Sequence, residues 1–266
     1  MAAVDRRQML TAIGSSSVLA YCAGRRSLAE AVDSGSALEG RKPAGEREDP
    51  WRYRPLDPEA CADRAYAIYP EGGCMYAVVG SVLGELSARY GAPYDAFPVA
   101  MMRYGDGGVG AWGSLCGVVN GGAALCGLFH PEQDKATLEQ LVTELCTWYE
   151  TSALPQYAPT RPEWASETMP CVAGSLLCHV SVGRWCKVAE RDAFSIEKKE
   201  RCRRLASDGA KKVVEILNRK ASGDGGHAAL APAVTNCLEC HGPEGTRDAM
   251  GKMSCTTCHQ MPETHP

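Results

Sequence analysis

Large apolar side chains are almost missing from the last thirty residues of this chain, 237–266. Leu238 and the methionines Met250, Met253 and Met261 are the only sizeable hydrophobic residues there. A segment of this composition cannot bury enough apolar area to offset the conformational entropy that it loses on folding. We therefore expect something other than protein side chains to form its core.

The same segment contains two copies of the pattern C-x-x-C-H. The residues that define the two copies are Cys237, Cys240, His241, Cys255, Cys258 and His259. Two thiols about one helical turn apart can add to the two vinyl groups of a porphyrin, and the next residue then lies under the iron. Each copy therefore predicts one covalent haem c, with His241 or His259 as the proximal iron ligand and the macrocycle as the missing apolar core.

Zinc or paired disulfides are the competing interpretations of these four cysteines. The gap of 14 residues between Cys240 and Cys255 falls just short of the usual spacing between two zinc-binding C-x-x-C pairs. Zinc needs only the four thiolates, so it gives no reason for a histidine directly after both pairs. The pattern therefore favours two haems.

The N-terminal region lacks a hydrophobic run that is long and apolar enough to span a bilayer. Residues 1–31 contain the adjacent Arg6 and Arg7, followed by a weakly apolar stretch that glycine and serine interrupt. This pattern is typical of a twin-arginine signal peptide, with cleavage expected after Ala31 and only a loose lipidation motif at Cys22. Bacteria attach haem c outside the cytoplasm, so we expect a periplasmic protein without a membrane span. Twin-arginine export of folded proteins also hints at a second cofactor, inserted before export.

A strong excess of charge is also missing. The full chain has a net charge of −4, and removing a signal peptide of net charge +2 leaves −4 − 2 = −6. An acidic surface argues against nucleic acid or an anionic membrane as a partner and suits a basic redox protein. The sequence contains no nucleophile–base pair, phosphate loop or nucleic-acid motif.

The number of cysteines excludes a body in which every thiol forms an internal disulfide. Fourteen cysteines, less Cys22 and the four haem cysteines, leave nine. Nine is odd, so cluster ligation or redox-active thiols are attractive roles for several of them. Cys74 directly follows two glycines at an expected helix start, where backbone N–H groups and the helix dipole favour the thiolate, the form that binds iron.

Helical periodicity dominates the remainder, and no strand-like alternation of any length is present, so we predict a mainly α fold. We expect a flexible lead-in over 32–58, a compact helical Cys/Gly-rich domain over 59–217, a linker over 218–234 and a small di-haem module over 235–266. The helix expected near 195–221 shows an apolar stripe, and its charged residues are expected to form a solvated opposite face.

Each haem iron needs a sixth ligand if the protein only carries electrons. The candidates are His179, which adjoins Cys178, and His227 and His130, which lie in expected loops; His265 is a further histidine near the terminus. The alternative donors are Met250, Met253 and Met261. The sequence does not decide among them.

Taken together, these residues resemble the split-Soret cytochromes c, members of the redox family named for its C...GCAxxG...C...C pattern. Cys61, Cys74 in "GGC", Cys116 in "GSLCGVV" and Cys126 in "ALCGLF" follow the four family cysteines in order. The chain departs from the pattern at Met75 and Val78, which replace the family alanine and glycine. The resemblance implies a mostly helical, exported di-haem homodimer with bis-histidine haems and an iron–sulfur centre. It makes Cys61, Cys74, Cys116 and Cys126 the candidate ligands of that centre, with Cys171, Cys178, Cys186 and Cys202 as the rival set.

Two functions follow from these expectations. The first is an electron-transfer protein that passes electrons between a partner, the two haems and an iron–sulfur centre. The second is a small haem or dithiol oxidoreductase, with an open iron site or reactive cysteines.

Overall fold

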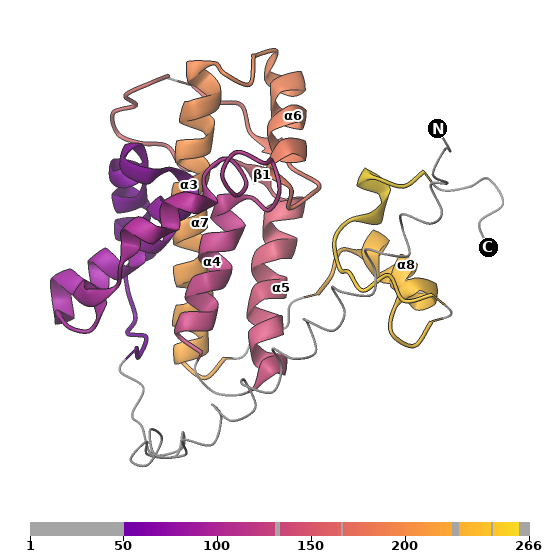
Figure 1. Ribbon diagram of the computed structural model, residues 1–266, viewed down its shortest axis with the longest axis horizontal. Helices are drawn as coiled ribbons and strands as arrows, with labels where there is room; N and C mark the ends of the chain where they lie inside the picture. Colours follow the sequence, from indigo (N-terminus) through magenta and orange to yellow (C-terminus); the bar gives the residue numbers. More distant parts are fainter. Residues whose placement is uncertain (1–50, 131–133, 166, 225–228, 246, 261–266) are drawn as a thin grey trace, which may run out of the picture. The chain divides into compact units, whose positions relative to one another are not determined.

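The computed structural model describes residues 51–130, 134–165, 167–224, 229–245 and 247–260, and these are mainly helical, as expected (Figure 1). The helices are α3 (Pro58–Tyr90), α4 (Gly117–Leu128), α5 (Lys135–Thr151), α6 (Cys178–Ala189), α7 (Ile196–Ala221) and α8 (Pro232–His241). Short 3-10 turns span Tyr94–Ala96, Val99–Gly105 and Cys255–Thr257. The strands β1 (Ala153–Leu154) and β2 (Cys171–Val172) form one short antiparallel pair. None of these described helices is both long and apolar enough to cross a membrane.

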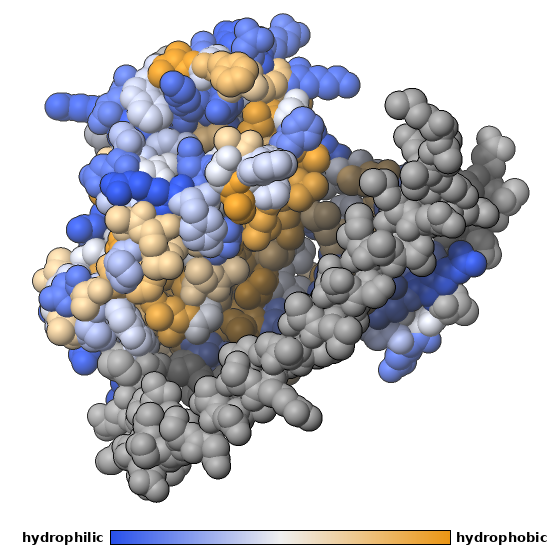
Figure 2. All heavy atoms as spheres, viewed as in Figure 1, coloured by the Kyte–Doolittle hydropathy of each residue, from blue (hydrophilic) through white to orange (hydrophobic). Residues whose placement is uncertain are grey.

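The core forms where α3, α4, α5 and α7 pack together. Small residues allow the close approach of these helices: a side chain at Gly209 of α7 would collide with Val118 of α4. Val78 of α3, Val118 and Leu145 of α5 are fully buried between them. Figure 2 shows hydrophobic residues reaching the surface of the described body between polar ones. The most exposed large apolar side chains around the second 3-10 turn and the loop after it are Met101, Tyr104 and Trp112.

The lead-in predicted over 32–58 is fixed to the body at its C-terminal end. Asn218 of α7 clamps it, because its side chain accepts from Leu56 N at 3.1 Å and donates to Leu56 O at 2.8 Å. The Tyr53 hydroxyl donates to the same amide oxygen at 2.9 Å. Residues 51–57 therefore belong to the helical domain, and α7 likewise continues to Ala221, into the segment expected to be linker. Residues 1–31, with the expected signal peptide, lie outside the described residues.

The prediction that the charged residues of α7 form a solvated face is wrong for five of them in the first half of the helix, because all five are buried. They are Glu200, Arg201, Arg203, Arg204 and Asp208. The segment after β1 covers this face of the helix, where Glu163 pairs with Arg203 at 2.8 Å and Ala165 O accepts from Arg204 at 3.0 Å. Periodicity detects the apolar stripe of a helix, but it cannot show that polar backbone from a distant segment covers the other side.

Asp208 is the buried carboxylate at the end of this group. Its two oxygens accept from the backbone N–H groups of Gln156 at 2.7 Å and Tyr157 at 2.8 Å. Burial nevertheless raises the pKa of Asp208 to about 6, since desolvation outweighs the two hydrogen bonds, which lower the pKa. The native state therefore holds this proton more tightly than the unfolded chain does.

We expect a pH-dependent stability from Asp208 that falls as the pH rises from about 4 to 6 and is constant above that range. The pKa shift corresponds to a change of about 2 to 3 kcal/mol in the free energy of unfolding over this pH range. The variant Asp208→Asn should lack this change, whatever its stability at a single pH. Urea unfolding followed by circular dichroism between pH 4 and 7 measures this difference. Parallel profiles for the two proteins would show that Asp208 does not titrate in this range.

Candidate redox centres

Three buried thiols meet in the interior, two from helices and one from the residue that precedes a helix. Gly73, at φ 77°, interrupts α3, and the helix restarts at Cys74. Cys74 neighbours Cys202 of α7, and Cys116, which precedes the first residue of α4, lies beside both. The three residues are no more than 8% exposed, and we call Cys74, Cys116 and Cys202 the thiol cluster.

The thiol cluster holds one easily ionised group. A hydrogen bond from Cys74 and the positive charges of Arg201 and Lys198 lower the pKa of Cys202 to about 6, although burial opposes them. The same hydrogen bond, together with burial, raises the pKa of Cys74. This hydrogen bond and burial therefore oppose the thiolate form that is expected at Cys74 from its position at a helix start.

Tyrosine hydroxyls surround these sulfurs. The Tyr69 hydroxyl lies 3.7 Å from Cys74 Sγ. The Tyr149 hydroxyl lies 2.9 Å from Ser181 Oγ and within hydrogen-bonding reach of Cys116. Sequence reasoning missed these tyrosines, because nothing local distinguishes them from core aromatic residues.

Two further cysteines lie near the thiol cluster on α6. The Cys178 N–H donates to Ser114 O at 2.7 Å, and its thiol is close enough to Cys116 and Cys202 for their charges to raise its pKa, after burial. A side chain at Gly108, at φ 73°, would meet Cys178 Cβ at 2.7 Å, so this glycine allows the loop to approach α6. The pKa of Cys186, farther along α6, is raised mainly by burial and also by the charge of Cys202. Cys171 lies in β2.

Cys61 and Cys126 do not reach the thiol cluster. Cys61 lies twelve residues before Gly73 in α3, a distance of about 18 Å, and Cys126 lies ten residues after Cys116 in α4, about 15 Å away. Burial is the main reason that the pKa of each thiol is raised to about 12. The four cysteines expected from the family pattern therefore cannot bind one iron–sulfur centre together in this fold. The thiol cluster instead combines two cysteines of the family-pattern set, Cys74 and Cys116, with Cys202 of the rival set.

The donor types of the thiol cluster fit an iron–sulfur centre, since thiolates are its usual ligands. Within the described residues, no three His, Cys, Asp or Glu side chains converge closely enough to hold a metal ion as they stand. Binding would therefore require these side chains to turn toward a common point. Burial, the lowered pKa of Cys202 and the nearby Arg201 guanidinium all suit a centre held by thiolates, which would carry negative charge.

The two C-x-x-C-H copies lie against each other. Cys237, Cys240 and His241 form the last turn and a half of α8, and Cys255 begins the last 3-10 turn. Burial and then a hydrogen bond with Cys237 raise the pKa of Cys255, so the first cysteines of the two copies are direct neighbours. Haems attached at these positions would be adjacent.

Several contacts tie the second copy to the helical body. The Ser254 N–H donates to Glu150 Oε1 at 3.1 Å, and the Thr257 hydroxyl donates to Gly174 O at 2.5 Å. Arg184 Nη2 also donates to Thr257 Oγ1, at 3.4 Å. The second C-x-x-C-H copy, at 255–259, is thus held against α5, α6 and the segment after β2.

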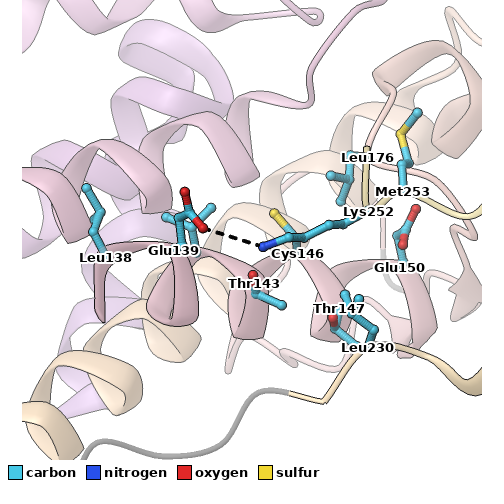
Figure 3. A pocket seen from close by; sticks show the side chains of 11 residues that line it. Leu138, Glu139, Thr143, Cys146, Thr147, Glu150, Leu176, Leu230, Lys252 and Met253 are labelled. Carbon is cyan, nitrogen blue, oxygen red and sulfur yellow. Dashed lines mark ion pairs between the residues drawn. The ribbon is translucent and has the colours of Figure 1, made fainter. Parts of the chain in front are cut away.

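A cavity of about 440 Å³ opens beside the second C-x-x-C-H copy (Figure 3). Its walls are mostly apolar and come from α5 and the segments around Leu176 and Met253. Lys252 and Glu139 are also among its lining residues, and their charged atoms form an ion pair at 3.8 Å (Figure 3). A mostly apolar cavity of this size next to Cys255 fits part of a porphyrin.

The three candidate distal histidines differ in how free they are to bind iron. Both ring nitrogens of His130 are engaged, one with Asp134 O at 3.0 Å and the other with Lys220 Nζ. His130 would have to break one of these bonds to bind iron. His179 is exposed in the first turn of α6, beside Gly113, and His227 lies outside the described residues.

Comparison with known proteins shows what this chain is similar to. The model of a redox-active protein family, C_GCAxxG_C_C, matches residues 74–216. A split-Soret cytochrome c of Desulfovibrio desulfuricans is 35% identical to this chain over an alignment of 271 residues. The alignment covers 96% of this chain and 94% of the relative. A solved structure of the split-Soret cytochrome c from Desulfovibrio desulfuricans ATCC 27774, described as having a novel iron centre, aligns with a TM-score of 0.73 at 35% identity. That alignment covers 80% of this chain and 91% of the solved chain.

Proposed function

Because the chain belongs to the split-Soret cytochromes c, within the C_GCAxxG_C_C family, we propose that it is an exported di-haem electron carrier with an additional iron–sulfur centre. The contact between Cys237 and Cys255 is the observation that carries this proposal. Two covalent haems attached at these cysteines would lie close together, on a segment that has no other core. Adjacent haems suit rapid electron exchange with each other.

The iron–sulfur centre is proposed at the thiol cluster, with Cys178 as a further donor within reach. The lowered pKa of Cys202 supports this placement, since iron binds the thiolate. His241 and His259 are the proposed proximal haem ligands. Exposed His179 is the proposed distal ligand among the described histidines, and His227 remains a candidate.

The proposed setting is the periplasm, reached through a twin-arginine signal at 1–31. The acidic mature chain suits a basic redox partner. A homodimer is also proposed, and the exposed Met101, Tyr104 and Trp112 support it, because exposed apolar side chains mark protein interfaces when they gather.

We expect protein matured in a cytochrome-c-competent host to carry two covalent haems and additional non-haem iron. Intact-mass measurement counts the haems, and elemental iron analysis against the haem content counts the rest. Six-coordinate irons should leave the visible spectrum unchanged by carbon monoxide or nitrite. A spectral change would favour the alternative, an oxidoreductase with an open haem, and an unmodified mass would contradict the haem proposal itself.

A further inference from the structure

Arg201 carries a positive charge into the protein interior. Its side chain lies among the largest fully buried ones, and it extends from α7 toward the thiol cluster. Arg201 Nη1 lies 3.9 Å from Cys202 Sγ, and Nη2 donates to Ser181 Oγ at 2.8 Å. Its Nε has no hydrogen-bond partner within the described residues.

The surroundings of Arg201 differ from those of the other buried arginines on α7. Arg204 pairs with Glu200 at 2.7 Å, and Arg203 pairs with Glu163 at 2.8 Å. Among the described residues, no carboxylate lies within ion-pair distance of Arg201. Burial lowers its pKa, but the ionised forms of Cys202, Tyr149 and Cys116 outweigh burial and raise it.

A buried guanidinium without a counter-ion is costly, because the charge loses its hydration and gains no partner. Among the thiols and the phenol that face Arg201, Cys202 is the one with a lowered pKa, whereas the pKa values of Cys74, Cys116 and Tyr149 are raised. A bound iron–sulfur centre would hold these thiols as thiolates, and the structure provides a buried positive charge beside them.

We propose that Arg201 is the counter-charge of the iron–sulfur centre at the thiol cluster and that it raises the reduction potential of that centre. This inference rests on the function proposed above. When one electron passes from a ferrous haem, which becomes ferric, one iron of the centre changes from ferric to ferrous and the site gains one negative charge. A fixed positive charge about 4 Å from a ligand sulfur favours that reduced state.

The position of Arg201 is itself held in place. Ser181 Oγ lies within hydrogen-bonding distance of both Arg201 and Tyr149. The guanidinium therefore cannot turn away from the thiol cluster without breaking its hydrogen bond to Ser181. Lys198 also lowers the pKa of Cys202, but it is partly exposed, and water screens its charge. Arg201 is therefore the dominant positive charge at the site.

The test is a potentiometric titration of the holoprotein, followed by electron paramagnetic resonance of the iron–sulfur centre, in the wild type, R201Q and R201K. We expect R201Q to lower the ratio of reduced to oxidised centre at a fixed potential at least tenfold, which is about 59 mV for one electron. R201K should restore most of this loss. R203Q is the matched control, because Arg203 is equally buried on the same helix but pairs with Glu163, and it should change the ratio less than twofold.

Iron content and circular dichroism separate the outcomes. If R201Q retains the iron and its titration matches the wild type, the inference is overturned. If folded R201Q loses the iron while R201K keeps it, the counter-charge role is supported as a requirement for assembly; loss in both variants contradicts a role of charge. A folded wild type with haems but no non-haem iron overturns the proposed centre itself, and with it this inference.

Discussion

Replacing Cys202 by serine is expected to remove at least nine tenths of the non-haem iron and to leave both haems in place. Cys202 is the most readily ionised thiol of the thiol cluster, and it lies between Cys74, Cys116 and the Arg201 guanidinium. A serine hydroxyl has nearly the same size, but it stays protonated and is a poor ligand for iron. Elemental iron, measured against covalent haem in the purified holoprotein, gives the result directly.

Cys61 and Cys126 provide the matched controls for this substitution. Both thiols are completely buried and follow the family pattern, but they lie about 15 to 18 Å along their helices from Cys116 and Gly73. Cys61→Ser and Cys126→Ser should therefore destabilise the fold modestly and keep the full complement of iron. Iron loss in these controls, with iron retained in Cys202→Ser, would move the centre away from the thiol cluster.

The double variant Cys255→Ser/Cys258→Ser is expected to carry one haem in place of two. Without thioether bonds the second porphyrin is no longer retained, and the mass added to the polypeptide falls by half. The apolar cavity beside α5 then loses its proposed occupant, so residues 252–260 should become far more accessible to protease. Intact-mass measurement and limited proteolysis of the secreted protein report the two effects.

Cys146→Ser is the control for the haem substitution, since Cys146 lines the same cavity but belongs to no attachment motif. It should retain both haems and the protease resistance of the wild type. The corresponding change in the first motif, Cys237→Ser/Cys240→Ser, should also remove one haem. Retention of two covalent haems in either double variant would contradict the proposed attachment sites.

The sequence predicts those features that depend on local spacing. The two C-x-x-C-H copies are recognisable from five consecutive residues each, and the mainly α fold follows from helical periodicity. The start of a helix at Cys74 was also predictable, because the preceding glycines can break a helix. These features need no knowledge of which helix packs against which.

Membership of the thiol cluster could not be predicted, because it depends on tertiary packing. Order along the chain suggested Cys61 and Cys126, but the rigid rise of α3 and α4 carries them away from Cys74 and Cys116. Cys202 joins the cluster from a helix whose charged residues pointed to a solvated surface. The one local sign that Cys202 could be a ligand is the arginine beside it in "ERCRR". This sign has a meaning only because both residues are buried, which the sequence does not show.

The C-terminal turn of α5 links the two redox regions through neighbouring residues. Tyr149 reaches the Cys116 thiol, while the next residue, Glu150, accepts from the backbone of Ser254, which precedes Cys255. Only two noncovalent steps therefore separate a sulfur of the thiol cluster from Cys255, a proposed haem attachment residue. An electron that passed between the proposed iron–sulfur centre and the proposed second haem would have a path of covalent bonds and two noncovalent contacts.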